Sequence, residues 1–209
     1  MSKILKVYIV SYCTDQDLLF LGDAMRQADL LIGVDQGVGM LIKHGFIPDY
    51  AIGDFDSLDI RQINLPEACK IIHLPTEKDE TDLEYALNYV QKLEDPAEVI
   101  MINSLQGRID HTLSAVYLLE GREQVCLVNA HHKVFLPHQH FYYPVQPATT
   151  VSLLPLSETV TEVWTKGLYY PLQGETLHRN QGRGLSNKSV DSKVEINFLD
   201  GKLLIIVDH

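Results

Sequence analysis

The sequence predicts an α/β protein in which a parallel-sheet domain is followed by a smaller all-β sandwich domain. Up to about residue 130, short apolar runs alternate with helix-like segments, a pattern typical of parallel strands joined by helical crossovers. Beyond that point, short strands are separated by Pro and Gly, which is typical of a sandwich. A chain of 209 residues has room for one full domain and a smaller one.

The first domain is expected to contain buried strands. Its apolar runs are nearly continuous, as in strands that are covered on both faces of a parallel sheet. The predicted strands are residues 4–10, 30–34, 50–52, 69–73, 98–102 and 125–128.

Helices are predicted between several of these strands. They cover residues 15–28, 36–44 and about 82–94, with a fourth after strand 98–102. The second is closed by Gly45 and the fourth by Gly121, in keeping with the preference for Gly just past a helix end. The third has the clearest start, because Thr81 is suited to cap it and Glu84 follows three residues later.

The second domain is predicted from five strand-like runs and one long polar segment. The runs are residues 149–156, 159–165, 167–172, 193–199 and 202–209. The polar segment 174–189 is expected to be a loop. Just before this domain, His138 and His140 have the spacing of a metal pair, but no third ligand accompanies them. We therefore interpret their segment as surface joining the domains.

Composition narrows the possible partners and location. A formal charge of -11 argues against a nucleic-acid partner, because such binding requires Lys and Arg to neutralise phosphates. No apolar run is long enough to span a membrane, and the first residues show no secretory leader pattern, so we expect a cytoplasmic protein. Three cysteines without CxxC spacing suit buried, reduced thiols.

The stretch 33–58 contains the strongest candidate site. In GDFDSL, an extended backbone would send Asp54 and Asp56 to the same side, and Gly53 would let another group approach closely. Two carboxylates about 4 Å apart repel by roughly 4 kcal/mol at an effective dielectric constant of about 20, so a cation or a shared proton must compensate, and among cations Mg2+ suits oxygen ligands. Asp35 is a third carboxylate in this stretch. The alternative is that these aspartates only form caps and Asx turns.

Two further polar motifs lie beside predicted helix starts. TEKDETD places Lys78, Asp79 and Asp82 where helix N-H groups favour anions, although acidic residues there are also ordinary capping groups. After strand 98–102, QGRIDH places Arg108 and Asp110 at the carboxyl edge of the sheet, where open α/β folds bind ligands.

The ordered motifs GVDQG, GDFDS, KDETD and GRIDH, followed by TKGLYYPL and GLSN, resemble those of the thiamine pyrophosphokinase family. The resemblance implies a Rossmann-like domain (1–132) and a β-sandwich thiamine-binding domain (133–209), in a homodimer with active sites at the interface. The implied activity is thiamine diphosphokinase: transfer of pyrophosphate from ATP to thiamine with Mg2+, releasing AMP.

The resemblance also implies roles for particular residues. Asp54, Asp56 and Asp82 would bind Mg2+, and together with Arg108 they are the expected catalytic residues. The expected nucleotide- or thiamine-binding residues are Asp35, Ser57, Lys78, Asp79, Asp110, His111, Ser186 and Asn187. From charge alone, Asp35 and Asp82 are both candidates for the base that accepts the hydroxyl proton, while the planar Arg108 guanidinium suits phosphate.

Two features depart from the family pattern, and two other functions stay open. NSLQGR replaces a glycine-rich run, and no aromatic residue closely follows Ser186 and Asn187. Tyr169, Tyr170 or Trp164 could stack on thiamine instead, and the alternative is that each is a core or rim aromatic. The same carboxylates would also serve a Mg2+-dependent nucleotide pyrophosphohydrolase. A non-catalytic nucleotide sensor is the other alternative. The sequence has no GxxxxGK[ST] loop, so it lacks the commonest ATPase signature.

Overall fold

The computed structural model describes residues 3–56, 60–93, 97–103, 105 and 108–209. They form two compact units: Met1–Leu118 with Gln124–Ala130, and Leu119–Glu123 with His131–His209. The domain boundary between residues 132 and 133 stays a prediction, because compactness does not show which part of a chain acts as a domain.

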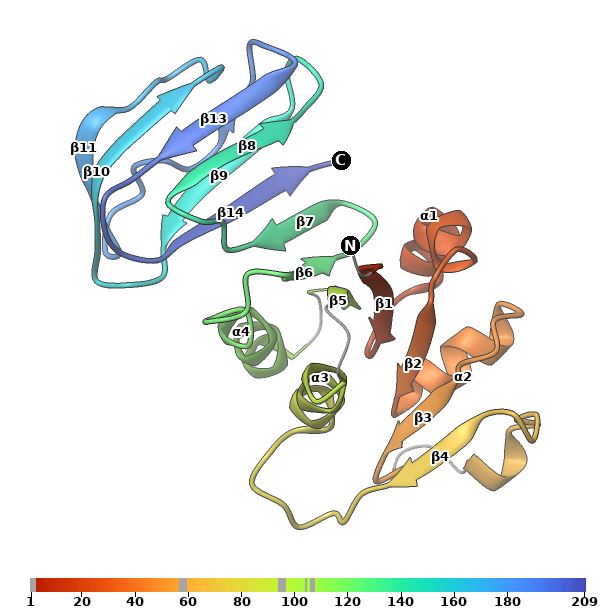
Figure 1. Ribbon diagram of the computed structural model, residues 1–209. Helices are drawn as coiled ribbons and strands as arrows, with labels where there is room; N and C mark the ends of the chain where they lie inside the picture. The colour runs from red at the N-terminus through yellow and green to blue at the C-terminus, as the bar shows by residue number, and fades with distance from the viewer. Residues whose placement is uncertain (1–2, 57–59, 94–96, 104, 106–107) are drawn as a thin grey trace. The chain divides into compact units, whose positions relative to one another are not determined.

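Parallel strands form the sheet of the first unit. They are β1 (Leu5–Val10), β2 (Leu30–Val34), β3 (Tyr50–Gly53), β4 (Lys70–His73), β5 (Ala97–Ile102) and β6 (Val125–Val128). Their order is β6-β5-β1-β2-β3-β4, and every neighbouring pair is parallel (Figure 1). The predicted strands are confirmed, with ends that differ by at most one residue.

Helices lie on both sides of this sheet. They are α1 (Asp15–Met25), α2 (Gln36–Lys43), α3 (Asp82–Gln91) and α4 (Ile109–Tyr117), with a 3-10 turn at Ile60–Gln62. Both α2 and α3 pack on β1 and β2, and Figure 1 shows them on opposite sides of the strands. Thr81 caps α3 as predicted, since its side chain accepts a hydrogen bond from the Glu84 N-H. In the described part of the chain, no helix is long and apolar enough to cross a membrane.

The second unit contains antiparallel strands in two groups. One has the order β12-β9-β14-β7 and the other, a separate sheet, the order β11-β10-β13-β8. The first group comprises β7 (His132–Phe135), β9 (Thr150–Pro155), β12 (Asn187–Lys188) and β14 (Leu203–Asp208). The second comprises β8 (His140–Pro144), β10 (Thr159–Lys166), β11 (Gln173–His178) and β13 (Lys193–Asn197).

Two predictions for the second unit are wrong. Segment 167–172 is not a strand: Leu168 makes only an isolated bridge to Ser189, while Tyr169 and Tyr170 are exposed. The polar segment 174–189 is not a loop throughout, because most of β11 and all of β12 lie within it. Pairing with β10 extends the polar β11 sequence, which has little strand propensity of its own.

Candidate active site

The first two carboxylates of the site follow neighbouring parallel strands. Val34 pairs with Ile52, and the next backbone N-H, that of Asp35, donates to the Ile52 carbonyl over 3.0 Å. Asp35 therefore directly follows β2 and lies beside the end of β3. Asp54 directly follows Gly53, the last residue of β3. This is the carboxyl edge of the sheet, where open α/β folds bind ligands.

Asp82 completes a cluster with these two residues. It is the first residue of α3, placed there by the Thr81 cap. One carboxylate oxygen from each of Asp35, Asp54 and Asp82 lies within 4.8 Å of the others, and all three residues are half-buried. An oxygen-only set of this kind has the chemistry that Mg2+ prefers.

Asp35 reaches the cluster through an unusual backbone conformation. Its φ is 47°, and although it stands at the N-cap position of α2, its side chain makes no capping hydrogen bond. A β-carbon on Gly53 would overlap Asp35 Oδ1, so only glycine leaves space for this carboxylate. The close approach predicted at Gly53 is thus made by Asp35. Backbone conformations of this kind cost energy and concentrate at functional sites.

The cluster shifts the protonation of Asp35. Burial, a hydrogen bond with Asp82, and the negative charges of Asp82 and Asp54 raise the pKa of Asp35 from 3.8 to about 7. Its Oδ1 is buried without a hydrogen-bond donor among the described residues. A carboxylate oxygen in that position is suited to coordinate a cation.

Lys78 brings a positive charge into contact with the cluster. Its Nζ lies 2.9 Å from Asp82 Oδ1 and 3.5 Å from Asp54 Oδ2. Asp54 Oδ1 instead accepts the Asp56 N-H over 3.1 Å, which closes an Asx turn. That backbone hydrogen bond is the main cause of the lowered pKa of Asp54, and Lys78 also lowers it. Asp54 therefore forms an Asx turn and also contributes an oxygen to the group of three carboxylates.

The extended backbone predicted through Asp54 and Asp56 is wrong. Phe55 has a φ of 57° and buries its ring with Val38, Ala51 and Cys69. The left-handed conformation interrupts the alternation, and Asp56 is exposed and lies outside the group of Asp35, Asp54 and Asp82. The role of Asp56 as a metal ligand stays a prediction.

The predicted nucleotide-binding residues lie partly elsewhere. Arg108, just before α4, is exposed and pairs with Asp110 through Nη2-Oδ2 and Nε-Oδ1 distances of 2.6 and 3.2 Å. This pair holds the pKa of Asp110 at about 2. Asp79 and His111 are exposed, and Ser57 lies outside the described residues. Since β1 separates β5 from β2, Arg108 follows a strand that does not adjoin the acidic cluster.

Ser186 and Asn187 lie in the second unit, where Asn187 lines a cavity of about 360 Å³. The buried Asn187 amide accepts the Tyr170 N-H over 3.0 Å and donates to the Tyr170 carbonyl over 2.7 Å. Ser186 has a φ of 52°, and its N-H donates to Ser152 Oγ over 2.9 Å. Asn187 thus fixes the backbone that presents Tyr169 and Tyr170, whose exposed rings meet edge to face.

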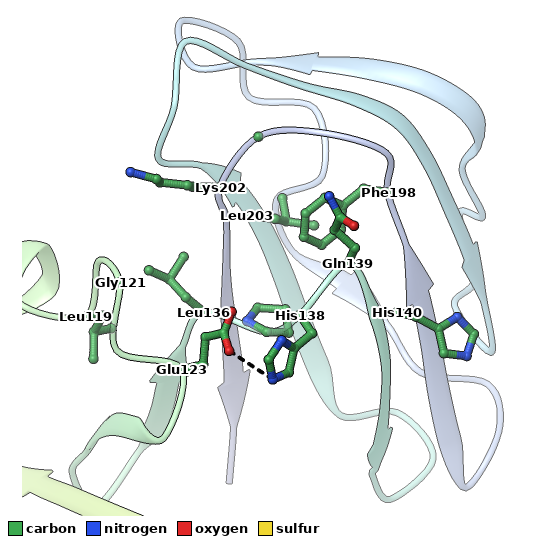
Figure 2. Close-up of a pocket in the computed structure, with 12 residues that line it drawn as sticks. Leu119, Gly121, Glu123, Leu136, His138, Gln139, His140, Phe198, Lys202 and Leu203 are labelled. Atoms are coloured by element: carbon green, nitrogen blue, oxygen red, sulfur yellow. Dashed lines mark ion pairs between the residues drawn. The ribbon is translucent and has the colours of Figure 1, made fainter.

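The predicted histidine pair lines another cavity of the second unit, with a volume of about 570 Å³. Figure 2 shows His138 directed at Glu123, with an Nε2-Oε2 distance of 3.0 Å, while His140 points away from both. The two histidines therefore do not converge as metal ligands. His138 precedes β8 and only His140 belongs to it, so strand alternation does not place the two side chains on one face.

Sequence reasoning missed the contacts of Lys78 with the carboxylates. It named Asp35 as a third carboxylate of its stretch but listed it among the nucleotide- or thiamine-binding residues, whereas the structure places its oxygen beside those of Asp54 and Asp82. A signal for Lys78 was present, because Lys78 stands four residues before Asp82, the first residue of α3, and this spacing is short enough for the two side chains to meet. For Asp35, the signal was its position directly after a buried strand.

The fold and the cluster define an α/β protein with an acidic site at the carboxyl edge of a parallel sheet, suited to metal-dependent chemistry on phosphates. Family models narrow this class. Residues 21–128 match the thiamin pyrophosphokinase catalytic domain, and residues 138–203 match the thiamin pyrophosphokinase vitamin B1 binding domain. The chain belongs to the thiamine pyrophosphokinase family.

Individual relatives agree with this membership. The chain is 31% identical over 186 residues to the thiamine pyrophosphokinase of Bacillus subtilis (strain 168), covering 85% of this chain and 86% of that relative. A Geobacillus thermodenitrificans thiamin pyrophosphokinase structure has a TM-score of 0.82 at 25% identity and 98% coverage of both chains. An Enterococcus faecalis family structure has a TM-score of 0.83 at 23% identity, covering 98% of this chain and 99% of that one.

Proposed function

We propose that this protein is a thiamine diphosphokinase, which transfers the pyrophosphoryl group of ATP to the hydroxyl of thiamine. The products are thiamine diphosphate and AMP. The observation that carries the proposal is the match to a catalytic domain followed by a vitamin B1 binding domain, with the acidic cluster inside the first match. In finer detail, we propose that the two parts are a Rossmann-like domain and a β-sandwich domain.

The reaction requires an alcohol to attack a phosphorus atom surrounded by anionic oxygens. The thiamine hydroxyl oxygen forms a bond to the β-phosphorus of ATP, the bond from that phosphorus to the bridging α-β oxygen breaks, and AMP leaves. Catalysis of such transfers depends mainly on positioning and charge neutralisation. A cluster of carboxylates that hold a divalent cation supplies both.

Mg2+ fits the acidic cluster. Asp35, Asp54 and Asp82 offer converging oxygens, and Asp35 Oδ1 has no hydrogen-bond donor among the described residues. We propose these three residues as ligands, with Asp56 as a further candidate. When bound, Mg2+ would neutralise the phosphates and align them. Asp35 and Asp82 are also the candidates for accepting the hydroxyl proton, and the cluster contains both.

The remaining predicted contacts complete the substrate sites. We propose that Arg108 exchanges part of its pairing with Asp110 for phosphate oxygens, because the pair is exposed and the planar guanidinium group matches the geometry of phosphate. Asp79, His111 and Ser57 are proposed for the same nucleotide. Thiamine would meet Ser186 and Asn187 in a homodimer whose subunits share each site. The cytoplasmic location also stays a proposal.

Product analysis tests the proposed activity. Incubation with Mg2+ and ATP should release AMP only when thiamine is present, with thiamine diphosphate formed in equal amount, as measured by chromatography. AMP or pyrophosphate released at the same rate without thiamine would instead identify a pyrophosphohydrolase. Binding of ATP without any turnover would identify a nucleotide sensor. The Asp54→Asn variant serves as the negative control, because it removes a charged oxygen ligand from the cluster.

A further inference from the structure

Lys78 lies between two members of the acidic cluster. Its Nζ contacts Asp82 Oδ1 at 2.9 Å and Asp54 Oδ2 at 3.5 Å, and it donates a hydrogen bond to the Pro75 carbonyl over 3.0 Å. The Lys78 side chain is only 14% exposed, as is that of Asp82. An ion pair this enclosed is screened less by water and salt than a surface pair.

The lysine and a divalent cation need the same oxygens. Mg2+ binds carboxylate oxygens directly at about 2.0–2.1 Å and demands near-octahedral geometry. A metal ion bound by Asp54 and Asp82 would therefore lie within a few ångströms of the ammonium group, where two cations repel strongly. Both cations cannot keep their full set of contacts with these two carboxylates.

The flexible side chain of Lys78 allows a change of partners. Its backbone belongs to the segment between β4, which ends at His73, and α3, which begins at Asp82. Four side-chain bonds rotate in lysine, so the ammonium group moves without a change in the fold. The N-terminus of α3 is also a place where N-H groups favour phosphate oxygens, to which an ammonium group is attracted.

We propose that Lys78 is an exchangeable counter-ion of the acidic cluster, which competes with the divalent cation for Asp54 and Asp82 and binds ATP phosphate once released. This inference rests on the proposed function for its second step only. The first step, competition with a divalent cation, is a property of the described residues and is measured without ATP or thiamine.

The competition predicts that removing the lysine strengthens metal binding. Mn2+ is the probe, since its unpaired electrons report free and bound ion directly by electron paramagnetic resonance. We expect Lys78→Met to bind Mn2+ about tenfold more tightly than the unmodified protein, within the usual range of coupling between two bound species. The matched control is Lys43→Met, which removes an exposed lysine 2.7 Å from Asp15 and the same unit of charge. It should leave the affinity unchanged.

Two outcomes of the Mn2+ binding measurement contradict the proposed competition. Equal or weaker Mn2+ binding in Lys78→Met, or no Mn2+ binding by any of the proteins, overturns the competition. Circular dichroism checks that the variants fold, and Lys78→Gln replaces Lys78→Met if the latter does not. The two substitutions differ in polarity, but both remove the positive charge of the Lys78 ammonium group.

Kinetics test the second step. At saturating Mg2+, Lys78→Met should raise the KM for ATP by about tenfold while Lys78→Arg, which keeps the charge, retains most of the affinity. An unchanged KM for ATP in Lys78→Met contradicts the contact with phosphate. If the unmodified protein forms no AMP with thiamine, the proposed function fails, whereas the Mn2+ measurement still decides whether Lys78 competes for the cluster.

Discussion

Gly53 is the residue on which the position of the Asp35 carboxylate depends. A β-carbon there would overlap Asp35 Oδ1, so Gly53→Ala must displace one of the cluster's ligands. We expect a loss of stability of about 1–3 kcal/mol. Turnover should fall by about a hundredfold, because small displacements of catalytic groups have large effects. Urea unfolding and AMP formation measure the two effects.

Gly22 in α1 provides the matched control for this substitution. Its added β-carbon would lie 3.5 Å from Phe46 Cζ, an ordinary contact, and it stands within a helix. Gly22→Ala should therefore stabilise the protein by about 0.5–1 kcal/mol and leave turnover unchanged. Gly53→Ala behaving like this control would show that the site tolerates a side chain at Gly53.

Asp35 makes the stability depend on pH in a defined direction. Its folded pKa of about 7 exceeds the ordinary 3.8, so the folded protein keeps the proton to higher pH than the unfolded chain does. The Asp35 contribution to stability is therefore full below pH 3.8 and is lost as pH rises to about 7. The Asp35→Asn variant has no carboxyl group to ionise at this position, so it does not lose this contribution. Its free energy of unfolding, relative to that of the unmodified protein, should therefore rise between pH 3.8 and about 7.

Urea unfolding in EDTA, at several pH values across the window and above it, measures the effect of Asp35→Asn without bound metal. The exposed Asp191→Asn variant is the control for removal of one negative charge. A difference between Asp35→Asn and the unmodified protein that stays constant with pH would contradict the assignment of a raised pKa to Asp35.

Sequence reasoning singled out the three carboxylates that the structure brings together, and it gave a fourth carboxylate the wrong direction. Asp35, Asp54 and Asp82 follow strand ends or begin a helix, positions that apolar periodicity and capping rules identify. The misplaced residue is Asp56. Its direction depends on the left-handed conformation of Phe55, which that residue adopts to bury its ring. No local rule predicts positive φ for phenylalanine, because tertiary packing decides it.

At the scale of elements, the start of α3 positions Asp82. Thr81 Oγ1 accepts the Glu84 N-H over 3.2 Å, and its loss leaves one donor of the first turn without its partner. Thr81→Ala should reduce stability by about 1 kcal/mol. It should also weaken Mn2+ binding, since the first turn that holds Asp82 frays more often.

Thr81→Ser is the control for the α3 cap, because it keeps the hydroxyl and loses only a methyl group. It should retain both the stability and the Mn2+ affinity, as measured by thermal unfolding and paramagnetic resonance. If Thr81→Ala melts at the same temperature as the unmodified protein, the cap contributes little to α3.

The strands of the two units were predictable to different degrees. Parallel strands such as β1 and β5 are continuous apolar runs, so hydrophobicity alone marks them. In the second unit, β11 has the sequence QGETLH and depends on pairing with β10, so its sequence was mistaken for a loop. Aromatic content suggested a strand at 167–172, where Gly167 instead takes a φ of 79° and both tyrosines face solvent.

At the scale of the whole molecule, the proposal of a shared site makes a quantitative prediction. The acidic cluster belongs to the first unit and Ser186 to the second. If each site combines these from different subunits, Asp54→Ala and Ser186→Ala should complement each other when co-expressed. Random pairing makes half of the dimers mixed, and each mixed dimer has one intact site, so activity should recover to about a quarter of the unmodified level.

Mass spectrometry of the intact assemblies confirms that mixed dimers form, and each variant expressed alone gives the baseline. Activity equal to the sum of the two baselines, with mixed dimers present, would show that a site is built within one subunit. An assembly that contains a single chain would contradict the proposed homodimer itself.

The path of the chain constrains how parts of this protein can be exchanged with relatives. Leu119–Glu123 belongs to the second unit although the residues on either side of it belong to the first, so the chain passes between units after residues 118, 123 and 130. A fragment or chimera joined only after residue 130 would separate His138 from its partner Glu123, and Lys202 from Glu120. Recombination that preserves each unit therefore needs three junctions, and a single crossover inherits a mismatched segment.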